Sequence, residues 1–169
     1  LDAADGALTV GRDGRRFALR APCPVKDFPA APAAPTGDAA IYGAELADAL
    51  DWTLPAASTD ETRPHLCCVN FTAGVAVASD GHRLHVREGM PQFDALLSRG
   101  TCEAIRAALA ATGAERVSAG ASAGNVSYRC EGRGLHVTVI AKRSGAAFPP
   151  HEQVVPREHD GTAHVAAAA

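Results

Sequence analysis

Near the middle of the chain stands the segment Val75-Ala76-Val77-Ala78-Ser79-Asp80-Gly81-His82-Arg83-Leu84-His85-Val86. Its first four residues are apolar and include two valines, which predicts a strand. The Asp-Gly pair that follows predicts a turn, because aspartate bonds to nearby backbone amides and glycine tolerates a left-handed backbone. The last three residues predict a returning strand. A sheet is therefore expected in the middle of the chain.

The residues before this hairpin predict a helix and further strands. A short strand begins at residues 41–42, and residues 43–57 carry an apolar stripe at helical spacing. The Ser-Thr-Asp-Glu-Thr run at 58–62 favours caps and turns, so it ends the helix. Residues 65–71 predict the next strand, which a Thr-Ala-Gly turn joins to the hairpin.

The same order returns in the second half of the chain. Residues 101–112 predict a helix whose inward face carries Ile105, Ala108 and Leu109. Strands are expected at residues 117–119, 126–128 and 135–140. Two helices and about eight strands predict an α+β fold, in which the two helices pack on antiparallel sheet halves.

An internal repeat gives a second view of the organisation. The hairpin pattern of residues 8–19 returns at residues 126–137, at an offset of 118, and both copies turn at an acidic residue followed by glycine and arginine. A Phe-Pro pair follows each copy, at 28–29 and at 148–149. Proline ends a strand ladder, so each pair closes its unit.

The repeat predicts four parts of the chain. Residues 1–28 are expected to be the tail hairpin of a preceding module, and the proline-rich residues 29–38 a linker. Residues 39–156 are expected to form one complete module, and residues 157–169 a linker stub. A first residue of leucine rather than methionine fits a chain cut from a longer one.

Composition excludes several classes of protein. The chain has 169 residues, a net charge of −3 and 47% hydrophobic residues, which suits one domain with a real core. No apolar run reaches the roughly 18 residues of a membrane span, and no signal peptide is recognisable, so we expect a cytoplasmic protein without a membrane partner. The five cysteines are odd in number and two are adjacent, which favours reduced thiols over a disulfide framework.

Metal binding could be argued from the group of His65 and Cys67-Cys68, with His82 and His85 further on. These residues lack the Cys-x-x-Cys and His-x-x-x-His spacings that metal sites use. We therefore expect no metal and no cofactor.

Catalysis is the second alternative. Ser79, Asp80 and His82 could form a hydrolase cluster, and Asp60 with His65 an acid–base pair. Neither group stands in a nucleophile elbow, and no Gly-x-x-x-x-Gly-Lys phosphate loop occurs. Solvated turns explain these polar residues better, so no enzyme is expected.

Several segments taken together resemble a known family. The similarity is to the central domain of the bacterial sliding clamp, the beta subunit of DNA polymerase III. Four segments carry it: residues 58–66, residues 79–84, the Phe-Pro pair at 148–149 and the Val-Val-Pro segment at 154–156. Residues 8–29 resemble the end of the clamp's first domain. The resemblance covers about residues 8–157, nearly the whole chain.

The resemblance implies a DNA-clamp fold and a function without catalysis. Clamps are rings of six similar domains with helices around the central hole, and they tether DNA polymerase to duplex DNA. Duplex DNA is then a partner only of a complete ring, and this chain alone is expected to be a monomer. An alternative is a clamp-derived peptide-binding protein that does not encircle DNA.

The resemblance also implies a pocket on the central domain, into which partner proteins insert a short Gln-Leu-rich peptide. Carried over by position, the lining of this pocket is Leu66, Ser79, Gly81, His82, Arg83, Leu84 and Pro156. From the residues alone, the glycine belongs to a hairpin turn and the leucines to the core. The resemblance favours the pocket instead, with the leucines as its apolar floor and the glycine allowing close backbone approach.

Two departures from the family concern this site and the DNA. Cys67-Cys68 stands where many clamps have Asn-Gly, and side chains there could narrow the pocket edge. The first helix carries acidic residues and no lysine or arginine, so it would repel phosphates. Arg99 and Arg106 on the second helix are the candidate DNA-facing residues, with Glu103 between them. The acidic residues of the first helix are Glu45, Asp48 and Asp51.

Overall fold

The computed structural model describes residues 2–4, 7–12, 15–20, 32–34, 36, 39–90 and 93–155. The chain divides into two compact units, Leu1–Ala33 and Ala34–Ala169. In the first unit, three antiparallel strands follow one another in the order β1-β2-β3. They span β1 Asp2–Ala4, β2 Ala7–Arg12 and β3 Arg15–Arg20. The hairpin predicted at residues 8–19 is therefore present, while its turn residues 13–14 lie outside the described residues.

The second unit repeats one order of elements twice: a strand, a helix and three strands. The first half comprises β4 Ala39–Tyr42, α1 Gly43–Thr53, a 3-10 turn η2 Leu54–Ala56, β5 Cys68–Thr72, β6 Val75–Ser79 and β7 Leu84–Glu88. The second half comprises β8 Ala95–Ser98, α2 Arg99–Thr112, β9 Arg116–Ala121, β10 Asn125–Gly132, β11 Leu135–Lys142 and a final 3-10 turn η3 His151–Gln153.

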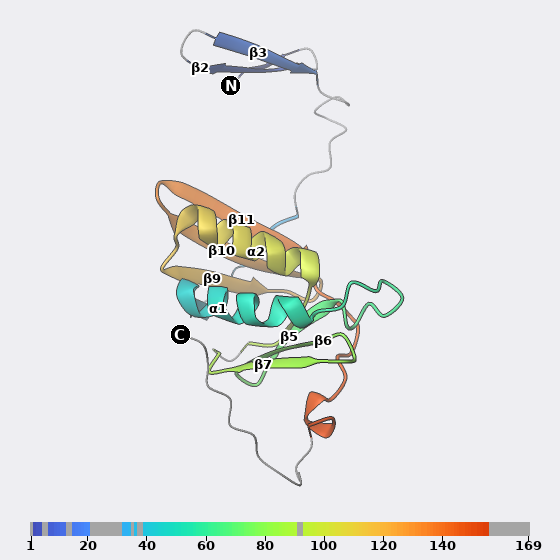
Figure 1. Ribbon diagram of the computed structural model, residues 1–169. Helices are drawn as coiled ribbons and strands as arrows, with labels where there is room; N and C mark the ends of the chain where they lie inside the picture. Colours follow the sequence, from blue (N-terminus) through green and yellow to red (C-terminus); the bar gives the residue numbers. More distant parts are fainter. Residues whose placement is uncertain are drawn as a thin grey trace, which may run out of the picture. The chain divides into compact units, whose positions relative to one another are not determined.

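Each half contributes one strand to the sheet of the other half. One sheet has the order β11-β10-β9-β4 and the second the order β7-β6-β5-β8, so β4 and β8 each pair with strands of the opposite half. All pairs are antiparallel. Figure 1 shows α1 and α2 side by side, with α1 against β6 and β7 and α2 against β10 and β11. The predicted α+β fold, with two helices on antiparallel sheets, is confirmed.

The core lies where the helices meet the sheets. Leu46 and Leu50 of α1 and Ile105 of α2 are fully buried there. Aromatic rings extend this core, because Phe93 stacks on Phe71 with 4.9 Å between ring centroids and meets Tyr128 edge-on. Each such side chain stabilises the fold by about 1.5–3 kcal/mol on burial.

The local sequence explains the ends of α2. The Ser98 hydroxyl accepts a hydrogen bond from the Thr101 amide, as an N-cap should. Gly113 ends the helix in the left-handed conformation, with φ of 59°.

The described helices include none that is long and apolar enough to cross a membrane.

Three sequence predictions were wrong in detail. The first helix ends at Thr53 rather than at 57, because the proline at 55 lacks an amide hydrogen and a 3-10 turn follows. Strand β5, predicted at residues 65–71, begins at Cys68 rather than at His65. Residues 58–67 form a loop instead, which the hydrogen bond from the Ser58 amide to the Leu66 carbonyl closes. Strand β8 was not predicted, since four residues, Ala-Leu-Leu-Ser, are too few to display a period.

At Gly43 the backbones of the two halves approach each other closely. Its amide donates to the Glu115 carbonyl over 2.8 Å, and a Cβ at this position would overlap the carbonyl oxygen of Ala114. We predict that Gly43→Ala lowers the free energy of unfolding by about 2 kcal/mol, because backbone must move to admit the methyl group. Urea unfolding followed by circular dichroism measures this change.

Gly100 provides the matched control. It lies in the first turn of α2, and a Cβ there would meet nothing within 4 Å. Gly100→Ala should leave the unfolding free energy unchanged or raise it by up to about 1 kcal/mol. Equal effects of the two substitutions would show that the close approach at Gly43 does not constrain the fold.

Candidate functional site

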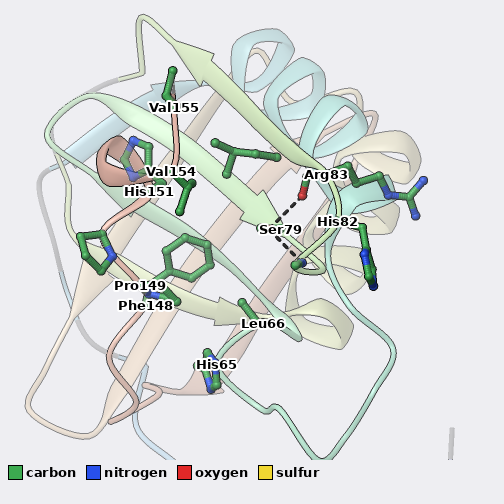
Figure 2. Close-up of a pocket in the computed structure, with 13 residues that line it drawn as sticks. His65, Leu66, Ser79, His82, Arg83, Phe148, Pro149, His151, Val154 and Val155 are labelled. Atoms are coloured by element: carbon green, nitrogen blue, oxygen red, sulfur yellow. Dashed lines mark hydrogen bonds between the residues drawn. The ribbon is translucent and has the colours of Figure 1, made fainter. Parts of the chain in front are cut away.

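A cavity of about 550 Å³ lies where three segments meet: the loop before β5, the turn between β6 and β7, and residues 148–155, which follow β11 (Figure 2). Its lining is mainly apolar, with polar side chains around it. The lining residues are His65, Leu66, Ser79, Gly81, His82, Arg83, Leu84, Phe148, Pro149, Pro150, His151, Val154 and Val155.

Six of the seven residues predicted for a pocket line this one cavity. They are Leu66, Ser79, Gly81, His82, Arg83 and Leu84. The seventh, Pro156, lies outside the described residues. The sequence does not indicate the other lining residues as parts of a pocket, although the Phe-Pro pair at 148–149 and the Val-Val pair at 154–155 belong to the segments that carry the resemblance.

The apolar floor is formed by residues from distant parts of the sequence. Leu66 is only 7% exposed, yet it does not belong to the main core cluster. Its backbone is held on both sides, because its amide donates to the Arg63 carbonyl and its own carbonyl accepts from Ser58. Leu84 begins β7, and Val154 of the C-terminal segment remains 69% exposed. An apolar side chain of a ligand could therefore cover surface that is now open to water.

The turn between β6 and β7 is held by its own side chains. The Ser79 hydroxyl donates to the Arg83 carbonyl over 2.8 Å and accepts from the Gly81 amide over 3.1 Å (Figure 2). The Asp80 carboxylate accepts from the amides of His82 and Arg83 and forms an ion pair of 2.9 Å with the Arg83 guanidinium. Gly81 has a φ of 94°, which favours glycine. The wall of the cavity is thus preformed.

The backbone hydrogen bonds from His82 and Arg83 lower the pKa of Asp80 to about 2. Asp80 therefore stays ionised throughout the neutral range, and the turn keeps its hydrogen bonds there.

A second turn on the same side repeats this arrangement. The Asp60 carboxylate accepts from the Thr62 side chain and amide and pairs with the Arg63 guanidinium over 3.0 Å. These hydrogen bonds lower the pKa of Asp60, and the largest contribution comes from the hydrogen bond of the Thr62 side chain. The Arg63 guanidinium also lies beside Gly81, so the two turns adjoin.

The two adjacent cysteines do not line the cavity. Both thiols point back into the loop that precedes β5, where Cys67 Sγ lies 3.1 Å from the Asp60 carbonyl and Cys68 Sγ 3.3 Å from the Pro64 carbonyl. Burial raises the pKa of the Cys68 thiol. The side chains that replace Asn-Gly therefore leave the cavity open.

The residues considered for metal binding and catalysis lie between residues 60 and 85, from the loop before β5 to β7. The Ser79 hydroxyl donates to a backbone carbonyl rather than to His82. Within residues 39–90 and 93–155, no group of three or more histidine, cysteine or acidic side chains could hold a metal ion.

The two candidate DNA-facing arginines have protein partners. Arg106 of α2 forms two hydrogen bonds to the Asp51 carboxylate of α1, over 2.6 and 2.7 Å, and the hydrogen bond from Arg106 lowers the pKa of Asp51. Arg99 donates to Glu103 over 3.0 Å and also to two backbone carbonyls, those of Leu54 and Ala57. Helices α1 and α2 contain no other lysine or arginine, so every cation of the two helices is paired.

Two sheets that exchange a strand, covered by a pair of helices, define the fold of a DNA-clamp domain, and the cavity lies at the edge of one sheet. Solved structures of bacterial sliding clamps have a similar fold. The beta sliding clamp of Caulobacter crescentus, with polyethylene glycol bound at a candidate beta-motif tethering region, is 28% identical with a TM-score of 0.75, over 92% of this chain and 44% of that clamp.

Two other clamps match at lower identity. The DNA polymerase III beta subunit of Thermotoga maritima is 21% identical with a TM-score of 0.75, over 92% of this chain and 44% of that protein. The clamp of Bartonella birtlesii bound to griselimycin is 23% identical with a TM-score of 0.73, over 91% of this chain and 44% of that clamp. No protein-family profile and no curated protein matches the sequence.

The resemblance to the bacterial sliding clamp is thereby confirmed in the fold. The chain spans about 44% of the length of the clamps it matches.

Proposed function

We propose that this chain is a module of a sliding clamp, a processivity factor of DNA replication that holds replication proteins by docking their short peptide motifs. The observation that carries the proposal is the cavity between Leu66, Leu84 and Val154 on a clamp-domain fold. The module acts by binding and not by catalysis, and it works in the cytoplasm with DNA polymerase as a partner. Encircling duplex DNA requires further modules, since a ring holds six.

The geometry of the cavity suits an extended peptide. An apolar side chain of the peptide fills the space between Leu66 and Leu84, and the exposed Val154 covers it from the C-terminal segment. Gly81 has no side chain to keep the peptide backbone at a distance. The amides and guanidinium of the preformed turn already have partners, so binding costs little ordering of the protein.

A second function is favoured by the surface of the helices. Glu45, Asp48 and Asp51 are exposed on α1, and the two arginines of α2 are paired. Phosphates that approach this surface meet no unpaired cation of the helices and several carboxylates. The alternative is therefore a clamp-derived protein that docks peptides without encircling DNA.

Peptide docking is tested with a fluorescein-labelled Gln-Leu-type clamp-binding peptide, followed by fluorescence anisotropy. We predict saturable binding with a Kd between roughly tens of micromolar and one millimolar, because one module offers only part of a clamp's surface. Leu84→Ala should weaken binding at least about tenfold, since it removes apolar surface from the floor. Leu135→Ala is the matched control, because Leu135 is 47% exposed on β11, in the other sheet.

Peptide binding that is equally weakened by both leucine substitutions would exclude the cavity as the docking site. No binding at millimolar protein would overturn the proposed function.

DNA binding by this chain tests the second function. In a gel-retardation assay at about 0.15 M salt, we predict no complex with a short duplex at micromolar concentrations of this chain, because the helix surface repels phosphates. Replacing two carboxylates, as in Glu45→Lys with Asp48→Lys, should produce a measurable complex. Micromolar duplex binding by the unaltered chain would contradict the alternative and favour a DNA-facing role of the helices.

A further inference from the structure

Three histidines lie around the cavity, and each comes from a different segment. His65 belongs to the loop before β5, His82 to the turn after β6 and His151 to the 3-10 turn η3. Figure 2 shows them around the apolar floor rather than within it. The three residues are far apart in the sequence, and the fold places all of them on the lining of one cavity.

The three imidazoles have no hydrogen bond or ion pair with another side chain or the backbone across the described part of the second unit. The two remaining described histidines of this unit differ. His85 bonds to the Trp52 carbonyl over 2.7 Å, and His136 lies 3.5 Å from the Glu131 carboxylate. The histidines around the cavity therefore keep their hydrogen-bonding capacity for a ligand.

The cavity lining contains no carboxylate. The nearest acidic groups are those of the two turns, and both already have guanidinium partners: Asp80 pairs with Arg83 and Asp60 with Arg63. Each pair contributes no net charge. The charge of the cavity lining is consequently set by its three histidines, because an imidazole is neutral when deprotonated and cationic when protonated.

Other charged groups lie on the same elements but outside the cavity lining. Their contribution is a fixed charge on exposed surface, where water and salt screen it. They are Glu61 in the loop before β5, Arg87 and Glu88 on β7, and Glu152 on η3.

From this placement we infer that the cavity selects acidic peptides, those that carry aspartate or glutamate beside the apolar anchor, and that it binds them more tightly as the pH falls from 8 to 6. This inference rests on the proposed function, since it concerns the same cavity. Protonated imidazoles bind carboxylates by charge-assisted hydrogen bonds, and neutral imidazoles lose that charge. The apolar floor supplies binding at either pH.

The test uses two labelled Gln-Leu-type peptides. One carries two acidic residues beside the apolar anchor, and the matched peptide has Asn or Gln in their place. Anisotropy titrations at pH 6.0 and pH 8.0, at constant ionic strength, give four Kd values. We expect the acidic peptide to bind about fivefold more tightly at pH 6.0 than at pH 8.0, and the neutral peptide to change by less than about twofold.

Variants assign the effect to residues. In the combined variant His65→Gln, His82→Gln and His151→Gln, the pH effect on the acidic peptide should fall below about twofold. His136→Gln is the matched control, because His136 lies on β11 in the other sheet, and it should retain the full pH effect. Circular dichroism at both pH values checks that each variant is folded.

The outcomes separate this inference from the function on which it rests. If both peptides bind, Leu84→Ala weakens binding at least about tenfold and pH acts equally on the two peptides, then the selection of acidic peptides is wrong and the docking function stands. If the pH effect persists in the combined histidine variant, the inference is also wrong. If neither peptide binds at millimolar protein, the docking function and the inference fail together.

Discussion

The exchange of strands β4 and β8 between the two halves is the constraint on which the rest of the structure depends. Helix α1 begins directly after β4, and α2 directly after β8, so each strand that joins the opposite sheet carries its helix with it. The buried faces of the helices then complete one core, in which Ile41, Leu50 and Ile105 are fully buried. This arrangement also positions the cavity. Strand β8 pairs with β5, and β5 pairs with β6, so the pairing holds in place both the loop before β5 and the turn after β6.

One wall of the cavity is a turn that is hydrogen-bonded within itself, and the opposite wall comes from far along the chain. Asp80 and Ser79 use their side chains within the turn, so the shape of that wall follows from a local sequence. The opposite wall consists of the segment that follows β11, in which Val154 and Val155 remain exposed. A cavity of this kind offers apolar surface to the proposed peptide while the polar groups of the turn between β6 and β7 already have hydrogen-bond partners. The charge of the site then depends on histidines, which is the physical basis of the inferred selection of acidic peptides.

Local chemistry made some features predictable, and nonlocal contacts hid others. The turn at Asp80-Gly81 and the inward face of α2 follow from residue order alone. The loop at 58–67 does not, because its closure depends on backbone bonds such as that of the Ser58 amide to Leu66. His151 and Val154 contribute to the cavity from more than eighty residues beyond Leu66, and no local pattern reveals that contact. The ion pair of Arg106 with Asp51 joins two helices and was equally invisible in the sequence.

If this cavity, and not the surface of the helices, is the working site of the module, a peptide should perturb the cavity alone. The most direct test is an amide chemical-shift titration of the ¹⁵N-labelled protein with a Gln-Leu-type peptide. We predict that the amides of Leu66, Gly81, Leu84 and Val154 shift together and saturate with a single Kd, while exposed amides of α1 and α2 stay unchanged. Shifts confined to the helices, or an absence of shifts at the cavity at saturating peptide, would contradict it.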